Sequence, residues 1–171
     1  MKYFTISEML KSDTALKMRI WNGATKEHEE NLRALIENVL DPLRERYGHP
    51  IYVSSGYRCP KLNNAVNGAL NSQHMRGEAA DIYARGAGDG GSLSAMTASG
   101  DENLKLAQMI AKAGNFDQMI LEEVGPNDLK PCWIHVSYKR NGWNRRNILK
   151  KVSGKAGYII IPPPLASSLS L

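Results

Sequence analysis

Long apolar segments are absent from the sequence. No run approaches the roughly 20 apolar residues that a helix needs to cross a bilayer, so we expect no membrane insertion. The apolar residues near the start are interrupted by Ser7, Glu8, Lys11 and Asp13, which is not the pattern of a secretory signal. We therefore expect the protein to be synthesised in the cytoplasm without a signal peptide.

Cysteine is scarce. The two cysteines, Cys59 and Cys132, lie far apart in the chain, which excludes a CxxC motif. We expect two reduced thiols, as is usual for a protein made in the cytoplasm. A single disulfide between them is the alternative.

Acidic residues are missing from one long stretch. Between Lys130 and Lys155 there is no Asp or Glu, whereas eight residues are Lys or Arg (130, 139, 140, 145, 146, 150, 151 and 155). Such a stretch is typical of a protein that faces an anionic polymer, either nucleic acid or an acidic cell wall, or of a solvated basic surface. No recognisable nucleic-acid-binding motif accompanies the charge, so we expect no nucleic-acid partner.

The residues that are present suit one soluble domain. The chain has 171 residues, of which 42% are hydrophobic and 23% charged, and these values are ordinary for a globular protein with a core. Glycine and serine are concentrated in residues 85–100, which predicts a loop. We expect a domain over residues 1–152, including this loop, and a loosely packed or disordered tail over residues 153–171.

Hydrophobic periodicity predicts an α+β fold. Residues 25–47 carry apolar side chains at helical spacing, with Thr25 as the N-cap and a kink expected at Pro42. Further helical segments are expected at 60–66 and 101–114, and strands at 49–58, 77–84, 116–124 and 132–138. This order predicts a small antiparallel sheet flanked by helices.

Two potential metal ligands lie in the stretch SQHMRGEAADI, residues 72–82. His74 and Asp81 can bind a metal through an imidazole nitrogen and a carboxylate oxygen, and Gly77 lets the chain turn between them. Alone, the pair is a weak signal, because short motifs often occur by chance. A catalytic zinc takes three protein ligands. His135, between apolar residues of a predicted strand, is either the third ligand or a buried core histidine.

One arginine and two glutamates could also take part in chemistry. Arg58 ends a predicted strand, where a guanidinium suits a carboxylate or a developing oxyanion, or forms a surface ion pair. In the predicted strand 116–124, alternation places Glu122 on one face and Glu123 on the other. Either glutamate can serve as a general base or lie beside a turn as a surface acid.

The segments SGYRCPKLNNAVNGALNSQHMRGEAADI, FDQMILEE and WIHVSY together resemble the M15 family of zinc peptidases. This family contains D-alanyl-D-alanine carboxypeptidases and related endolysins that cut peptidoglycan. The combined pattern S-x-H-x-x-G-x-A-x-D with a distant W-x-H is specific, and the resemblance covers most of residues 3–140. It implies a single domain with a hedgehog or D-Ala-D-Ala-peptidase-like fold.

The resemblance also implies a role for each motif residue. His74, Asp81 and His135 would bind one Zn²⁺. Arg58 would polarise the scissile carbonyl and steady the tetrahedral intermediate. Ser72 would lie near the substrate or the metal ligands, where it hydrogen-bonds one of them or shapes the loop.

The general base is where this sequence departs from the family pattern. Many members have Glu or Asp three residues before the last histidine, a position that Cys132 occupies here. A thiol is a poor substitute for a carboxylate base. We expect Glu122 to replace it, with Glu123 as the alternative, and Cys132 could also serve as a further metal ligand.

The expected function is zinc-dependent hydrolysis of D-amino-acid-containing peptide bonds in peptidoglycan, by a carboxypeptidase or an endopeptidase. The basic stretch would suit an anionic wall. We expect a monomer that reaches the wall when released, as phage and prophage endolysins do. The alternative is a non-catalytic module that keeps the fold and binds cell wall or forms part of a phage particle.

Overall fold

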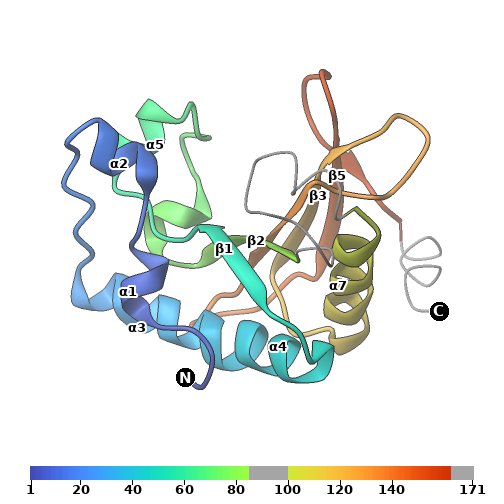
Figure 1. The fold of residues 1–171 in the computed structure, drawn as a ribbon, viewed down its shortest axis with the longest axis horizontal. Helices are drawn as coiled ribbons and strands as arrows, with labels where there is room; N and C mark the ends of the chain where they lie inside the picture. Colours follow the sequence, from blue (N-terminus) through green and yellow to red (C-terminus); the bar gives the residue numbers. More distant parts are fainter. Residues whose placement is uncertain (85–99, 163–171) are drawn as a thin grey trace.

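The computed structural model describes residues 1–84 and 100–162 (Figure 1). The loop predicted at 85–100 therefore lies outside the described residues, apart from Gly100, and so does the tail from residue 163 onward. Within the described ranges, no helix is long and apolar enough to cross a bilayer.

Six strands form one sheet in the order β1-β2-β4-β3-β5-β6. The strands are β1 (Ile51–Ser55), β2 (Ala79–Ala84), β3 (Gln118–Val124), β4 (Trp133–Ser137), β5 (Asn147–Val152) and β6 (Ile159–Ile160). All neighbouring pairs are antiparallel except β3 and β5, which run parallel. The sheet is therefore mixed. We expected an antiparallel sheet. The difference is the parallel strand β5, which the sequence pattern did not predict.

The helical segments surround this sheet. They are α1 (Ile6–Met9), α2 (Asp13–Lys17), α3 (Lys26–Leu35), the π-helical η1 (Ile36–Leu40), α4 (Asp41–Tyr47), α5 (Pro60–Ala65), the 3-10 helix η2 (Gln73–Arg76) and α7 (Gly100–Ala113). Figure 1 shows α2 beside α5, and these two pack through a small apolar cluster of Ala15, Ile20 and Leu62. The fold is α+β, as predicted.

The long helix predicted over residues 25–47 is present in three consecutive pieces, α3, η1 and α4. Thr25 caps it as expected, since its Oγ1 accepts a hydrogen bond from the backbone N–H of His28. The π-helical turn lies just before Pro42, which has no N–H to donate to the carbonyl of Asn38. That carbonyl instead accepts a hydrogen bond from the side chain of Asn115 at 3.0 Å.

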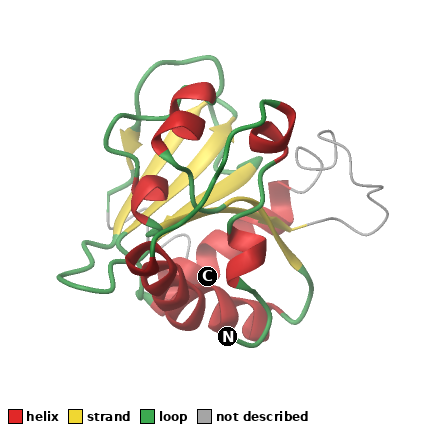
Figure 2. Cartoon of the chain, turned by 90° about the vertical axis from the view of Figure 1, so that its left-hand side faces the viewer, coloured by secondary structure: helices red, strands yellow, loops and turns green. Residues whose placement is uncertain are grey.

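One face of the sheet packs against α3, η1, α4 and α7, and Figure 2 shows a row of helices along the bottom of the molecule, below the strands. Leu35 and Leu106 from the helices and Ile82 and Val136 from the strands are fully buried in this core. Each such side chain contributes roughly 1.5–3 kcal/mol through burial. Because side chains alternate along a strand, the residues between these core positions point to the opposite face.

The described part of the expected tail takes part in the sheet. The β6 residues Ile159 and Ile160 pair with Lys150 and Leu149 of β5, and Ile161 is 7% exposed in the core. This packing differs from the loose tail that we expected, because the burial of Ile161 offsets the entropy lost on ordering the segment. The division into residues 1–152 and 153–171 stays a prediction.

Candidate metal centre and active site

His74 is held by the short helix η2 and by the turn that follows it. The Nδ1 atom of His74 lies 2.6 Å from the carbonyl oxygen of Gly56, so Nδ1 carries a proton and Nε2 presents its lone pair to the opposite side. Gly77 ends η2 with φ at +69°, and a Cβ atom there would lie 2.5 Å from the carbonyl oxygen of His28. Only glycine fits this turn without movement of the backbone.

Asp81 and His135 come from the sheet. They are direct cross-strand partners on β2 and β4, so their side chains share one face of the sheet. Their neighbours Ile82 and Ile134 point to the helical side and are fully buried. The hydrophobic pattern of the two strands therefore fixes the direction of both polar side chains.

The three side chains meet at one point. His74 Nε2 lies 3.2 Å from Asp81 Oδ1 and 3.1 Å from His135 Nδ1, and His135 Nδ1 lies 3.0 Å from Asp81 Oδ1. Zinc ligands at about 2.0–2.2 Å from a tetrahedral ion are about 3.3–3.6 Å apart, so this triangle is close to the size that one ion requires. Among the described residues, these three form the only His, Cys, Asp or Glu group that could hold a metal.

The charges of the group suit a cation. Burial by itself raises the pKa of Asp81, but the two imidazoles outweigh it and hold the pKa of that carboxyl well below its usual range. The carboxylate is therefore ionised at neutral pH. Two nitrogen donors and one anionic oxygen match the ligands that zinc takes in catalytic sites, where three protein ligands leave one position open.

The group opens into a cavity of about 330 Å³, which Arg58, Ser72 and Glu122 also line. Arg58 is half-buried, and its Nε has no hydrogen-bond partner within the described part of the chain. One of its terminal nitrogens donates a long hydrogen bond of 3.5 Å to the hydroxyl of Ser72. Burial lowers the pKa of Arg58, but a guanidinium stays protonated at neutral pH. Arg58 thus presents spare donors beside the metal-ligand group.

Glu122 lies in this cavity and Glu123 does not line it. The chain bends between them, since Glu123 has φ at +53° and the pairing of β3 with β5 is irregular after Leu121. Burial, with repulsion from Asp81, raises the pKa of Glu122 to about 7. Of the two candidate bases, Glu122 is the one that the fold brings to the metal-ligand group.

Cys132 points away from the group. Its thiol donates to the carbonyl oxygen of Glu123 at 3.5 Å, and burial raises its pKa. Cys132 and Cys59 are both free thiols, as expected, and the sulfur of Cys59 accepts a hydrogen bond from the N–H of Leu62 at the start of α5. The structure therefore gives Cys132 no place in the metal-ligand group.

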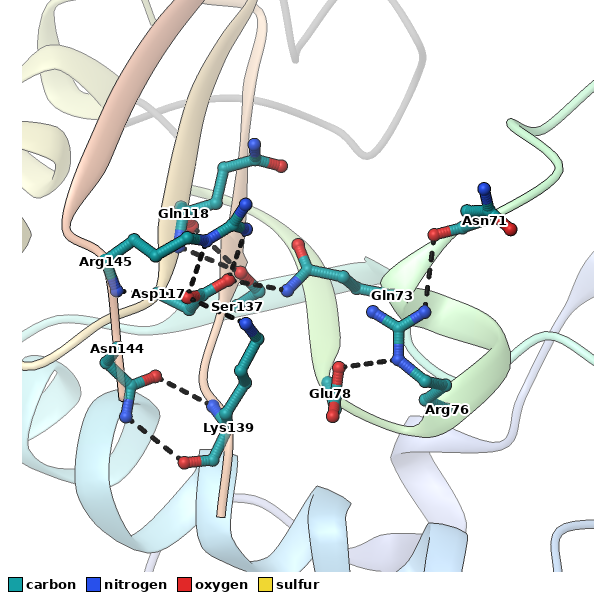
Figure 3. Close-up of polar contacts among 10 residues, drawn as sticks. All are labelled: Asn71, Gln73, Arg76, Glu78, Asp117, Gln118, Ser137, Lys139, Asn144 and Arg145. Carbon is teal, nitrogen blue, oxygen red and sulfur yellow. Dashed lines mark hydrogen bonds and ion pairs between the residues drawn. The ribbon is translucent and has the colours of Figure 1, made fainter. Parts of the chain in front are cut away.

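A buried polar network lies next to the group, and Figure 3 shows Asp117 at its centre. Asp117 is fully buried. Its carboxylate accepts hydrogen bonds from Gln73, the residue before His74, at 3.0 Å and from two nitrogens of the Arg145 guanidinium at 2.9 and 2.5 Å. Lys139 lies 3.5 Å away. The network ties η2 to the start of β3 and to the loop between β4 and β5.

Several cavity residues were not singled out from the sequence. Gln118 and Trp133 line the cavity from β3 and β4, while Leu149 and Tyr158 line it from the C-terminal part of the chain. Alternation along the strand could have indicated Gln118, which shares a face with Glu122. Tyr158 carries no sequence signal, because its position depends on the pairing of β6 with β5.

The fold and the site define an α+β domain with a candidate metal centre of two histidines and one aspartate beside a buried acid and an arginine. The sequence model of the family described as Peptidase M15 matches residues 2–109. The chain belongs to this family, so it is a peptidase and its substrates are peptides. No curated protein matches the chain.

The family match ends before part of the site. Arg58, His74 and Asp81 lie within residues 2–109, whereas Glu122 and His135 lie beyond them. The structure brings the two sets together, because β4 pairs with β2 on one side and with β3 on the other.

Proposed function

We propose that the protein is a zinc-dependent peptidase that hydrolyses D-amino-acid-containing peptide bonds of bacterial peptidoglycan. The observation that carries this proposal is the triangle of His74, Asp81 and His135, with sides of 3.0–3.2 Å, in a chain of the Peptidase M15 family. Zinc in such a site supplies a Lewis acid that activates water and polarises a carbonyl group.

Glu122 is the proposed general base. It lines the same cavity as the metal-ligand group, and it would accept a proton from the attacking water and later deliver it to the leaving amine. A general base works best when its pKa lies near the operating pH. The pKa of about 7 that burial gives Glu122 meets this condition better than that of an exposed glutamate.

Arg58 is the proposed electrophilic residue. The terminal nitrogens make only a weak contact with Ser72, which leaves N–H groups free for the oxygen that becomes negative during the reaction. One well-placed donor of this kind is worth about 3–4 kcal/mol of transition-state stabilisation. Ser72 would hold Arg58 in place and line the substrate cavity.

Part of the positive charge in the basic stretch, residues 130–155, is paired with acidic side chains. Lys130, Lys139, Arg140 and Arg145 form ion pairs with acids from other parts of the chain. An attraction to an anionic cell wall would therefore rest on the other four basic residues of residues 130–155. We propose a wall-directed monomer of the endolysin type, without a nucleic-acid partner.

Digestion of purified peptidoglycan tests the proposal. The protein is incubated with peptidoglycan before and after removal of zinc by a chelator, and again after zinc is restored, and the products are identified by mass spectrometry. We expect cleavage next to D-amino acids that disappears with the chelator and returns with zinc. The products also distinguish a carboxypeptidase from an endopeptidase. Cleavage that persists without metal contradicts the proposal, and wall binding without cleavage favours a non-catalytic module.

A further inference from the structure

Tyr158 is an aromatic residue of the candidate active site that comes from the C-terminal part of the chain. It lines the same cavity as Arg58, Glu122 and the metal-ligand group. It lies beyond both the residues matched by the family and the motifs that carry the resemblance. Its side chain is available to a ligand, because Tyr158 is 55% exposed.

The hairpin of β5 and β6 holds Tyr158 at this position. Gly157, with φ at +77°, makes the turn before it. After it, Ile159 and Ile160 pair with β5, and the N–H of Ile161 donates to the carbonyl of Ile148 at 2.9 Å. The ammonium group of Lys151 lies 5.8 Å from the centre of the tyrosine ring, within the range of a cation–π contact. The backbone is thus held on both sides of Tyr158, and the ring has one contact, with Lys151.

The hydroxyl of Tyr158 is a free donor. It makes no hydrogen bond with any described residue. Burial and the negative charges of Glu122 and Asp81 raise the pKa of Tyr158, so its hydroxyl stays protonated at neutral pH. It therefore cannot act as a base there, but it can donate a hydrogen bond.

We infer that the Tyr158 hydroxyl binds the substrate by donating a hydrogen bond to a carbonyl oxygen of the peptide. This inference rests on the proposed function. The protonated hydroxyl has one hydrogen to donate, and a carbonyl oxygen of the peptide backbone is a matching neutral acceptor. The peptide would then be bound on two sides of the cavity, by Arg58, which follows β1, and by Tyr158, which precedes β6.

The test measures peptide affinity without turnover. Glu122→Gln protein is loaded with zinc, and calorimetry gives its Kd for a wall stem peptide ending in D-Ala-D-Ala. The same is done with Tyr158→Phe added, which removes only the hydroxyl and keeps the ring over Lys151. The loss of one neutral hydrogen bond of about 1 kcal/mol weakens binding about fivefold. Tyr3→Phe is the matched control, because Tyr3 contacts Asp41 and Arg44 of α4 and does not line the cavity, and we expect it to leave Kd unchanged.

A Kd for the Tyr158→Phe protein within twofold of its parent overturns the inference, as does an equal loss in the Tyr3→Phe control. Zinc content and melting temperature are measured on each protein, and a loss of either in the Tyr158→Phe protein also counts against a direct contact with the peptide. The proposed function is judged separately. If the protein with Glu122 intact neither binds nor cleaves wall peptides, the proposed function fails. If that protein cleaves them normally and Tyr158→Phe leaves Kd unchanged, only the role of Tyr158 is contradicted.

Discussion

At the scale of single residues, the site depends on which side of a strand each side chain faces. Glu122 and Glu123 are adjacent, but only Glu122 lines the cavity. Strand alternation predicted that the two would face apart. It could not predict the positive φ of Glu123, since that conformation follows from the irregular pairing of β3 with β5 and not from residue type.

The two glutamates allow a matched test of the proposed base. Replacement of Glu122 by Gln keeps the shape of the side chain but removes its ability to accept a proton. We expect kcat to fall by about 10²–10⁴-fold, with unchanged zinc content. The matched variant, Glu123→Gln, should retain its rate on the same peptidoglycan substrate. Equal rates for the two variants would remove Glu122 from the mechanism.

Gly77 allows a second test at this scale. An alanine there would adopt φ near +69° and would also approach the carbonyl of His28. We expect Gly77→Ala to lower the free energy of unfolding by about 1–3 kcal/mol and to weaken zinc binding, because His74 lies in the same turn. Urea unfolding and zinc titration measure the two effects.

The variant Gly48→Ala separates the backbone strain of a positive φ from the steric contact of the added Cβ atom. Gly48 has φ at +78° but nothing within 4 Å of the added Cβ, so this variant should lose less stability and keep its zinc affinity. If Gly48→Ala and Gly77→Ala behave alike, the contact with His28 is not what makes glycine necessary.

At the scale of secondary-structure elements, the sequence predicted the helices and strands whose apolar residues recur at a regular spacing. The helix over residues 25–47 and the strands that became β1 to β4 were recognised from apolar spacing and caps. The strand β5 was not, because its residues NILKKV do not alternate between apolar and polar side chains. Strand β6 has just two residues, too few for any period to be visible.

The network around Asp117 links elements that no sequence pattern connects, and it gives the fold a dependence on pH. Burial alone raises the pKa of a carboxyl, but the hydrogen bonds from Arg145 outweigh it and lower the pKa of Asp117 to about 2. A lowered pKa in the folded state stabilises the fold above the unfolded value near 4. This contribution, about 2 kcal/mol, is lost as the pH falls from about 4 to about 2.

Asp117→Asn tests this contribution. We expect the variant to be less stable than the natural protein at pH 7, with a difference that shrinks as the pH approaches 2. Urea unfolding at pH 7, 4 and 2 measures it. Glu27→Gln, which removes an exposed acid, should follow the pH dependence of the natural protein. A difference between Asp117→Asn and the natural protein that stays constant down to pH 2 would contradict the assigned cause.

At the scale of the whole molecule, the metal group joins distant parts of the chain. His74 and His135 are 61 positions apart and meet only in the folded sheet. A metal that binds the folded state alone stabilises it, by about 4 kcal/mol at a concentration 1,000 times Kd. We expect zinc to raise the free energy of unfolding of the natural protein by this order, as measured by chemical denaturation with and without the metal.

His135→Ala should lose most of this gain, because it removes one corner of the triangle. His49→Ala removes an exposed histidine outside the group and should keep the full gain. A stabilisation by zinc that survives in His135→Ala, or that disappears equally in His49→Ala, would show that the ion binds elsewhere.

The order of the site residues along the chain has a consequence for synthesis. A ribosome delivers Arg58, His74 and Asp81 before His135 and Tyr158. At about 5–20 residues per second, several seconds separate the second corner of the triangle from the third. A nascent chain therefore carries two ligands and an arginine before the third ligand and the hairpin are made, and the cavity is complete only after Tyr158 has been added.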